Sequence, residues 1–333
     1  MKIIQNSFVD GVGNTPLIKL KGPSELTGCN IYGKAEYLNP GGSVKDRAAL
    51  YLIKDAEEKK LISKGGTIVE GTAGNTGIGL CLIGNSLGYK TIIVMNDNQT
   101  QEKKDLLRNI GSDLRLVPPK PYSDDGNFVK VAGRLADEWR PQNNNGVVWA
   151  NQFDNVANAK AHYETTGKEI WEQTDGKDDG FICSSGTGGT ISGVSNALKE
   201  KNKDIKIYLA DPKGSSMYNY VKSGELKSEG SSITEGIGSS RVTKNFEKAR
   251  VDNAFSVDDK EALPVLYNLI KHEGLSLGTS CAINVCGAIK MAKELGPGKT
   301  IVTILCDKSE KYNSKLFNKS FLQEKGLPYP DWI

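Results

Sequence analysis

The sequence is poor in the residues that build metal and disulfide sites. Its 333 residues include only two histidines, His162 and His272, and none of its six cysteines forms a C-x-x-C pair. A zinc site is therefore not expected, because such sites cluster Cys and His ligands at short spacings. The cysteines fall mostly in apolar strand or helix patterns, which is typical of buried, reduced thiols.

Long apolar runs and excess charge are also missing. No window approaches 18 consecutive apolar residues, and the N-terminal residues lack the apolar stretch of an export signal, so we expect a cytoplasmic protein, with an organelle left open. The net charge is only +3, from 43 basic and 40 acidic residues. Without a basic stripe interleaved with aromatics or a polybasic arm, neither nucleic acid nor a membrane surface is an expected partner.

What is present is an ordinary globular composition with a strong alternation of patterns. Apolar residues make up 38% and charged residues 25% of the chain, whose length suits two domains or one large one. Short β-branched runs alternate with helical periodicity, which predicts an α/β fold with parallel sheets covered by helices on both faces. The expected strands are 67–70, 89–95, 113–117, 147–150, 180–184, 205–211 and 300–307. The expected helices are 77–86, 101–110, 129–139, 157–173, 189–200, 258–271 and 280–295.

The stretch Pro40-Gly-Gly-Ser-Val-Lys-Asp-Arg47 places one amine where a glycine loop enters a helix. Ser43 can cap this helix, which puts Lys45 in its first turn. There the unpaired N–H groups and the positive end of the helix dipole favour a neutral, nucleophilic amine. Taken alone, a lysine in a first helical turn is usually a solvated surface charge.

Two glycine-rich loops follow expected strands, where ligands bind in parallel sheets. The first, 71–79, can receive an anion such as a carboxylate on the N-terminus of the following helix, although a simple tight turn is an alternative. The second, 185–190, has the glycines, hydroxyls and following helix of a phosphate cup. It contains no lysine, which favours a single phosphate monoester over a nucleoside triphosphate. A third element, 278–281, enters a helix at Ser280, which is either an N-cap or a functional hydroxyl.

Together these elements are the set that a pyridoxal-phosphate enzyme acting on an amino acid requires. Lys45 would hold the cofactor's aldehyde, residues 186–190 its phosphate, and residues 72–76 the substrate α-carboxylate. A nicotinamide-dependent dehydrogenase is not favoured, since no G-x-G-x-x-G register fits the first loop.

Several motifs, in order along the chain, resemble those of the cysteine synthase (O-acetylserine sulfhydrylase) and cystathionine β-synthase family of fold-type II pyridoxal-phosphate enzymes. The resemblance extends from Gly13 to about Phe317. The motifs are PGGSVKDR (40–47), EGTAGNTGIGL (70–80), NQFDN through HYETTG-x-EIW (151–171), SSGTGGT (184–190), TEGIG (234–238) and LGTS (277–280).

The resemblance implies a fold and an assembly. The fold would be tryptophan synthase β-like, with two three-layer α/β domains and mainly parallel sheets. A small mobile domain, 46–154, would bind substrate, and a large domain formed by 1–45 and 155–333 would bind the cofactor. A homodimer is implied as well, and a complex with serine acetyltransferase is possible.

The resemblance also implies a role for individual residues. Lys45 would form the Schiff base with pyridoxal 5'-phosphate and later serve as acid and base, while Asn75 would meet the cofactor's ring oxygen and Ser280 its pyridine nitrogen. Gly236 would line the substrate entrance. The implied phosphate ligands are Gly186, Thr187, Gly188, Gly189 and Thr190, and the implied substrate-binding residues are Thr72, Ala73, Gly74, Thr76 and Gln152.

The implied reaction is β-replacement, in which O-acetyl-L-serine and sulfide give L-cysteine and acetate through an aminoacrylate. The alternatives are cystathionine β-synthase activity, suggested by Glu235 in TEGIG, a serine/cysteine β-lyase activity that uses the same aminoacrylate, and a catalytically dead binding partner with the same fold.

Three features depart from the family pattern or stand outside it. Ala73 replaces a common serine, and Cys281 is either an oxidation-prone thiol at a helix start or a buried inert one. The C-terminal residues 326–333 resemble the acidic, isoleucine-terminated tails of serine acetyltransferase, which suggests that the tail, with residues 331–333 at its end, visits an active site; an ordinary surface tail is the alternative.

Overall fold

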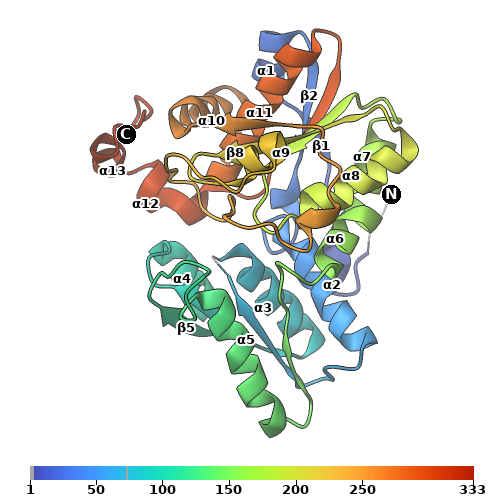
Figure 1. Cartoon of the computed structure of the whole chain (residues 1–333), viewed down its shortest axis with the longest axis vertical. Helices are drawn as coiled ribbons and strands as arrows, with labels where there is room; N and C mark the ends of the chain where they lie inside the picture. Colours follow the sequence, from blue (N-terminus) through green and yellow to red (C-terminus); the bar gives the residue numbers. More distant parts are fainter. Residues whose placement is uncertain (1–3, 73) are drawn as a thin grey trace.

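The chain forms two lobes, each built around its own β-sheet (Figure 1). A computed structural model describes residues 4–72 and 74–333. The lower lobe holds a four-stranded parallel sheet in the order β5-β4-β3-β6, and the upper lobe a six-stranded sheet in the order β1-β2-β10-β7-β8-β9. The strands are β1 (Leu17–Lys19), β2 (Asn30–Lys34), β3 (Thr67–Gly71), β4 (Lys90–Asn96), β5 (Asp113–Val117), β6 (Val147–Trp149), β7 (Gly180–Cys183), β8 (Lys206–Pro212), β9 (Asn253–Val257) and β10 (Thr300–Ile304).

Alternation along the strands of the four-stranded sheet buries apolar side chains on both of its faces. In β4, Ile92 and Val94 join a core cluster with Ala132 and Ala136 of helix α5 (Phe128–Trp139). The residue between them, Ile93, joins a second cluster on the opposite face with helices α3 (Asn75–Leu87) and α4 (Gln101–Asn109). Because successive side chains of a strand point to opposite sides, this pattern produces the three-layer arrangement that the sequence predicts.

The six-stranded sheet is parallel except for β1, which pairs antiparallel with β2. The last strand of the chain, β10, lies between β2 and β7 in the middle of this sheet. Strands β1, β2 and β9 were not among the expected strands. In β2 the apolar pattern is broken by Gly33, where a β-carbon would lie 2.6 Å from Leu305 Cγ, and by the buried Lys34.

All the expected helices are present, with four further helices that were not expected: α1, α9, α12 and α13. The expected helix 157–173 is interrupted by one wide turn over 162–166, where the Thr165 hydroxyl donates to the Ala161 carbonyl. The helices are α1 (Lys21–Thr27), α2 (Lys45–Glu58), α3 (Asn75–Leu87), α4 (Gln101–Asn109), α5 (Phe128–Trp139), α6 (Ala157–Ala161), α7 (Gly167–Gln173), α8 (Gly189–Lys201), α9 (Met217–Ser223), α10 (Asp259–Glu273), α11 (Thr279–Leu295), α12 (Asn313–Leu316) and α13 (Lys319–Glu324).

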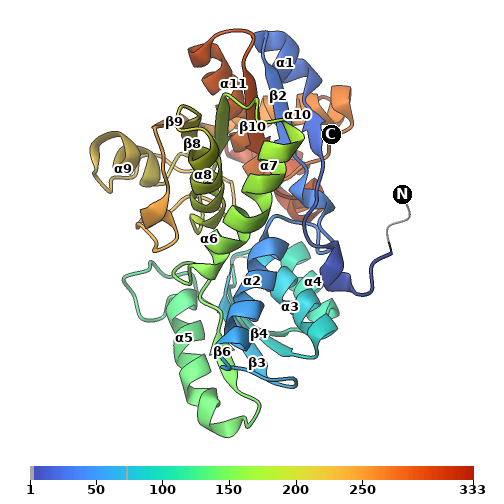
Figure 2. The same ribbon diagram turned by 90° about the vertical axis from the view of Figure 1, so that its right-hand side faces the viewer.

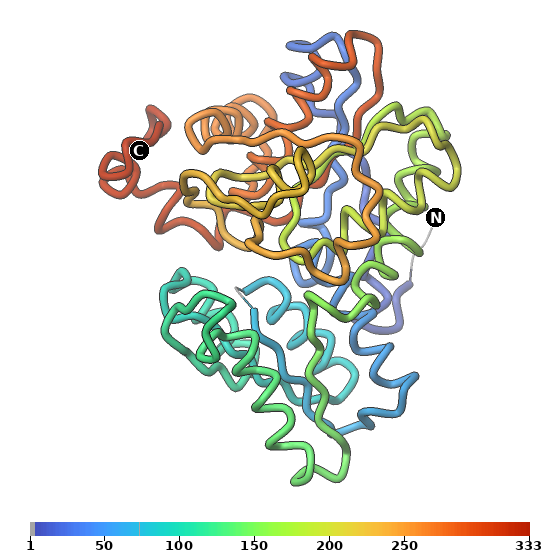
Figure 3. Tube along the Cα trace, viewed as in Figure 1, coloured from blue at the N-terminus to red at the C-terminus, as the bar shows by residue number. Residues whose placement is uncertain are grey.

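The chain passes between the lobes at α2 and again after β6, as the side view and the tube show (Figures 2 and 3). Val44 belongs to the core of the upper lobe and Ala49 to a core cluster of the lower lobe. The division into a mobile domain at 46–154 and a larger remainder stays a prediction. Within the described residues, we find no helix with the length and apolarity needed to cross a membrane.

Close packing of α8 on the wide turn gives a first test of the fold. A β-carbon at Gly193 would lie 2.3 Å from the Ala159 carbonyl oxygen and 2.6 Å from His162 Cβ. We expect Gly193→Ala to lower the free energy of unfolding by about 1–3 kcal/mol, the usual cost of overpacking. The control is Gly84→Ala in α3, whose β-carbon would come no closer than 3.3 Å to any neighbour, the Thr91 methyl. Urea denaturation of both variants measures the difference, and equal stabilities would contradict the packing.

Candidate active site

One cavity between the lobes gathers most of the residues that the sequence predicts to be functional. It has a volume of about 200 Å³. A smaller hollow of about 20 Å³, also lined by Lys45, adds Gly188 and Thr190. Ala73 lies outside the described residues. The predicted site residues that line the main cavity are Lys45, Thr72, Gly74, Asn75, Thr76, Gln152, Gly186, Thr187, Gly236 and Ser280.

Lys45 is the first residue of α2, as predicted, but the cap differs from the prediction. Val44 occupies the N-cap position, and the Ser43 hydroxyl accepts a hydrogen bond from the Lys45 backbone N–H at 3.3 Å. The segment is tied to the end of β10, because the Val44 N–H donates to the Cys306 carbonyl at 2.9 Å. The backbone before Lys45 is thus held by the six-stranded sheet.

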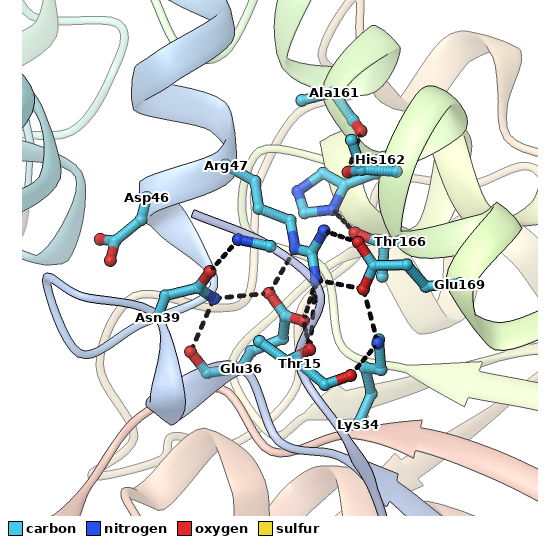
Figure 4. Close-up of polar contacts among 12 residues, drawn as sticks. Thr15, Lys34, Glu36, Asn39, Asp46, Arg47, Ala161, His162, Thr166 and Glu169 are labelled. Carbon is cyan, nitrogen blue, oxygen red and sulfur yellow. Dashed lines mark hydrogen bonds and ion pairs between the residues drawn. The ribbon is translucent and has the colours of Figure 1, made fainter. Parts of the chain in front are cut away.

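Two residues after Lys45, Arg47 sits in a cluster of buried charges (Figure 4). Its guanidinium donates to Glu36 at 2.7 Å from Nε and to Glu169 at 2.6 Å from one terminal nitrogen. Lys34 also pairs with Glu169, at 2.6 Å, and the Thr15 hydroxyl donates to Glu36 at 2.6 Å. The cluster therefore joins the N-terminal segment, β2, α2 and α7 around two positive and two negative charges.

The pKa values of the cluster follow from this pairing. Burial raises the pKa of Glu169, but Arg47 and Lys34 outweigh it and hold the value at about 2. Burial also opposes ionisation of Glu36, yet Arg47 keeps its pKa below the ordinary value. Removing one partner of such a buried pair leaves an uncompensated charge, which costs about 3–5 kcal/mol. The motif at 40–47 contained Arg47, and Thr15 lies where the family resemblance begins, but no pattern in the sequence pointed to Lys34 or Glu36.

The loop before Lys45 accepts only glycine at position 41. A β-carbon there would lie 2.6 Å from Asp46 Oδ1, while the Gly41 N–H donates to Asp46 Oδ2 at 2.6 Å. Asp46 is fully buried, and burial raises its pKa to about 7. Gly41 therefore allows a close approach of the loop to the first turn of α2, whereas Gly42 has φ +79°, a conformation that suits glycine.

The predicted phosphate cup lies at the N-terminus of α8. Gly188 is the N-cap residue and has φ +84°, a conformation that suits glycine. A β-carbon on Gly186 would lie 2.4 Å from the Gly236 carbonyl oxygen, so the cup and the 236–238 segment touch. Asn158 donates to the Thr187 hydroxyl at 2.9 Å. The first N–H groups of α8 have no partner within the helix and can bind an anion.

Behind the cup, a neutral histidine braces Thr190. His162 Nε2 lies 3.2 Å from the Thr190 hydroxyl oxygen, and Nδ1 lies 2.8 Å from the Thr166 hydroxyl oxygen. Burial, followed by the charge of Arg47, lowers the pKa of His162 to about 3. His162 is therefore uncharged at neutral pH and connects the cup to the wide turn before α7.

The predicted carboxylate loop is held by side chains of the lower lobe. The Thr76 hydroxyl donates to Gln152 Oε1 at 2.6 Å, and Gln152 Nε2 donates to the Gly71 carbonyl at 3.1 Å. The Gly74 N–H donates to the Thr72 hydroxyl at 3.2 Å. These contacts place Gln152 beside the loop, and its role next to a substrate carboxylate stays a prediction.

Ser280 lines the cavity but does not cap α11. The helix begins at Thr279 with Gly278 in the N-cap position, so the capping interpretation of Ser280 is wrong. Cys281 is fully buried, and burial raises its pKa well above the ordinary value. The interpretation of Cys281 as a thiol with a lowered pKa is therefore wrong, because the helix N-terminus does not offset the loss of solvent.

Sequence reasoning missed a charged group at the cavity wall. Lys103 of α4 and Glu235 form an ion pair, both line the cavity, and Lys315 of α12 also pairs with Glu235. The Lys103 ammonium lies 4.3 Å from the centre of the Tyr312 ring. Burial raises the pKa of Glu235, but the two lysines lower it further than burial raises it. The TEGIG motif drew attention to Glu235, whereas nothing marked Lys103 or Lys315.

The C-terminal tail packs on α10 in this structure. The rings of Trp332 and Tyr267 meet edge to face with centroids 6.2 Å apart, and Asp331 pairs with Lys271 at 3.3 Å. The predicted visit of residues 331–333 to an active site is thus not the arrangement seen here.

Comparisons with known proteins agree with this geometry. The family model described as pyridoxal-phosphate dependent enzyme matches residues 9–307. Cysteine synthase 1 of Emericella nidulans is 49% identical over 97% of this chain and 87% of its own length. Among solved structures, a hydrogen sulfide-producing enzyme from Fusobacterium nucleatum has a TM-score of 0.81 at 35% identity, covering 93% of this chain and 100% of its own. An O-acetylserine dependent cystathionine β-synthase from Helicobacter pylori has a TM-score of 0.83 at 31% identity, covering 94% and 99%.

The buried cluster around Arg47 predicts a pH-dependent stability. Because the pKa of Glu169 falls from 4.5 to about 2 on folding, its contribution is complete above pH 4.5 and is lost as the pH falls toward 2. We expect Glu169→Gln to lower the free energy of unfolding by about 3 kcal/mol at pH 7, with a smaller deficit below pH 4.5.

Urea denaturation between pH 3 and pH 8 measures both effects. The matched control is Glu172→Gln, an exposed position on the same helix, which should change stability by less than about 0.5 kcal/mol. A deficit in Glu169→Gln that does not change with pH would contradict the assigned pairing.

Proposed function

The chain belongs to the family of pyridoxal-phosphate dependent enzymes, and from that premise we propose that it converts O-acetyl-L-serine and sulfide to L-cysteine and acetate. The observation that carries the proposal is that Lys45, four residues of the 72–76 loop and Ser280 line one cavity, and that Lys45 also lines the smaller hollow together with the cup residues Gly186, Thr187, Gly188 and Thr190. High identity with a cysteine synthase over nearly the whole chain supports the choice of substrates.

The residues at this cavity fit pyridoxal 5'-phosphate. Lys45 would hold the aldehyde carbon, and the cup from Gly186 to Thr190 would hold the phosphate. The fit is supported by two positions that exclude side chains: Gly186 against the Gly236 carbonyl, and Gly189, where a β-carbon would lie 2.0 Å from Asn158 Oδ1. Backbone N–H groups can therefore approach an anion closely at the start of α8.

Ser280 would meet the pyridine nitrogen with a neutral hydroxyl. When bound, the cofactor withdraws electrons from the substrate α-carbon, which allows loss of the α-proton and of a group on the β-carbon. A neutral partner leaves the ring nitrogen without a proton and makes this withdrawal weaker than a carboxylate partner would. This weaker withdrawal of electrons favours β-replacement over transamination or racemisation.

The chain's own side chains would bind the substrate and move its proton. Thr72, Gly74, Thr76 and Gln152 would hold the α-carboxylate, which orients the α-hydrogen toward the Lys45 amine. Lys45 would take that proton as acetate leaves the β-carbon, and would return it after sulfide sulfur has bonded there. Gly236, on the segment that contacts the cup, would line the entrance used by substrate.

A second candidate is cystathionine β-synthase activity with the same first substrate. It is favoured by Glu235 and Lys103 at the cavity wall and by the similarity to the Helicobacter pylori enzyme. A serine/cysteine β-lyase would use the same residues. A catalytically dead binding partner is disfavoured because Lys45, Asn75 and Ser280 are all retained at one cavity.

The oligomeric state and the cellular location of the protein are proposals as well. We propose a homodimer, which light scattering after size-exclusion chromatography would test, and a cytoplasmic location. A complex with serine acetyltransferase is a further possibility that co-elution of the two purified proteins would decide.

Replacing Lys45 tests the proposed cofactor and chemistry together. The wild-type protein should be yellow, and adding O-acetylserine should shift its visible absorption. Lys45→Ala should lose that absorption and at least about 10³-fold in kcat, because it removes both the covalent contact and the proton carrier. Lys54→Ala, an exposed lysine on the same helix, is the control and should behave as wild type. A colourless wild-type protein that stays colourless with added pyridoxal 5'-phosphate would refute the proposal.

Assays with different pairs of substrates separate cysteine synthase activity from cystathionine β-synthase activity. O-acetylserine, O-phosphoserine and serine are each combined with sulfide and with homocysteine, and product is identified by mass spectrometry. We expect cysteine from O-acetylserine and sulfide at a kcat/KM at least about tenfold above that for any homocysteine reaction, a difference of about 1.4 kcal/mol in transition-state binding. A higher kcat/KM for a homocysteine reaction than for the sulfide reaction would favour cystathionine β-synthase.

A further inference from the structure

Asp307 is a buried carboxylate that lies just after β10 and outside the residues assigned above. Its side chain is fully buried, and its Oδ2 accepts hydrogen bonds from Asn75 Nδ2 and from the Tyr312 hydroxyl, both at 2.7 Å. Its Oδ1 has no hydrogen-bond partner among the described residues and lies beside Gly278, where a β-carbon would be only 2.1 Å away.

The backbone of Asp307 contacts two further segments of the site. It forms a β-bridge with Ser43, two residues before Lys45. Its carbonyl accepts a hydrogen bond from the Gly278 N–H at 3.0 Å, two residues before Ser280. Asp307 therefore touches each of the segments that carry Lys45, Asn75 and Ser280.

The contacts of Asn75 determine which way its amide faces. Asp307 as a carboxylate can only accept, so it selects the Asn75 NH₂ group. At the other end of the amide, the Lys311 ammonium can only donate, and it donates to Asn75 Oδ1 at 2.9 Å. With both ends assigned, the group that Asn75 can offer to the cavity is its second N–H, which is a donor.

We propose that Asp307 is a positioning residue that orients Asn75, so that an amide N–H rather than a carbonyl oxygen meets an anionic oxygen of the bound cofactor. The proposal rests on the proposed function and extends it to a residue that does not touch the cofactor. It also explains why the carboxylate is retained in a fully buried place, where an unpaired oxygen is costly.

Asp307→Ala removes the acceptor and should free the Asn75 amide to turn. We expect the visible absorption maximum of the holoenzyme to shift and pyridoxal 5'-phosphate to dissociate about tenfold faster on dilution, the effect of losing one charge-assisted contact. Asp307→Asn keeps one acceptor oxygen and should restore at least half of the wild-type retention. Lys311→Met, at the opposite end of the same amide, should shift the spectrum in the same direction, and it tests the proposal even if Asp307→Ala does not fold.

The matched control is Asp211→Ala. Asp211 is also fully buried, near the end of β8, and accepts from the Tyr218 N–H at 2.7 Å, but it does not line the cavity. It should lose stability without changing the spectrum or the dissociation of the cofactor. In an Asn75→Ala background, Asp307→Ala should change dissociation by less than about twofold, because the residue through which it acts is gone.

The outcomes separate the inference from the proposed function. Wild-type protein that binds no pyridoxal 5'-phosphate would refute the proposed function. Wild-type holoenzyme with unchanged spectra and dissociation in Asp307→Ala and Lys311→Met would refute only the role of Asp307. If the effects of Asp307→Ala and Asn75→Ala on the dissociation of the cofactor are fully additive, the role of Asp307 is refuted as well.

Discussion

The buried pairing of Arg47 with Glu36 and Glu169 is the constraint on which the site depends. Ionised side chains that are removed from water are stable only when each is paired with an opposite charge. This cluster therefore fixes the start of α2 relative to β2 and α7 (Figure 4). Lys45 lies two residues earlier on the same helix, so its backbone position is set by that pairing. The proposed Schiff-base lysine is thus held on a helix whose charged support, Arg47 with Glu36 and Glu169, does not line the cavity.

The ligand-binding elements are held by one another rather than by separate supports. The cup contacts the entrance segment where Gly186 meets the Gly236 carbonyl, and His162 connects Thr190 to the wide turn before α7. Asp307 contacts the segments around the amine, the amide and the serine. The glycine contact leaves no room for a β-carbon, and the other contacts are hydrogen bonds to buried groups. A small displacement of one of these elements is therefore transmitted to the elements that it touches.

The sequence predicted what depends on local pattern and missed what depends on distant pairing. The strands of the four-stranded sheet and the glycine loops were recognisable because β-branched runs and glycines act locally. Strand β2 was missed because Gly33 packs against Leu305 and Lys34 pairs with Glu169, both of which lie far along the chain. The Lys103–Glu235 pair joins residues from both lobes, and no periodicity marks such a contact. Most of the cavity lining was predicted, but not the residues that support it.

The central place of β10 has a consequence for how the chain is made. All four strands of the lower lobe lie within residues 67–149, so that sheet can form while the remainder is still being translated. The upper sheet cannot close until residue 304 has left the ribosome, because β10 is the only link between β2 and β7. Until then, the edges of β2 and β7 that pair with β10 have no partner strand, and unpaired strand edges are prone to associate with other chains.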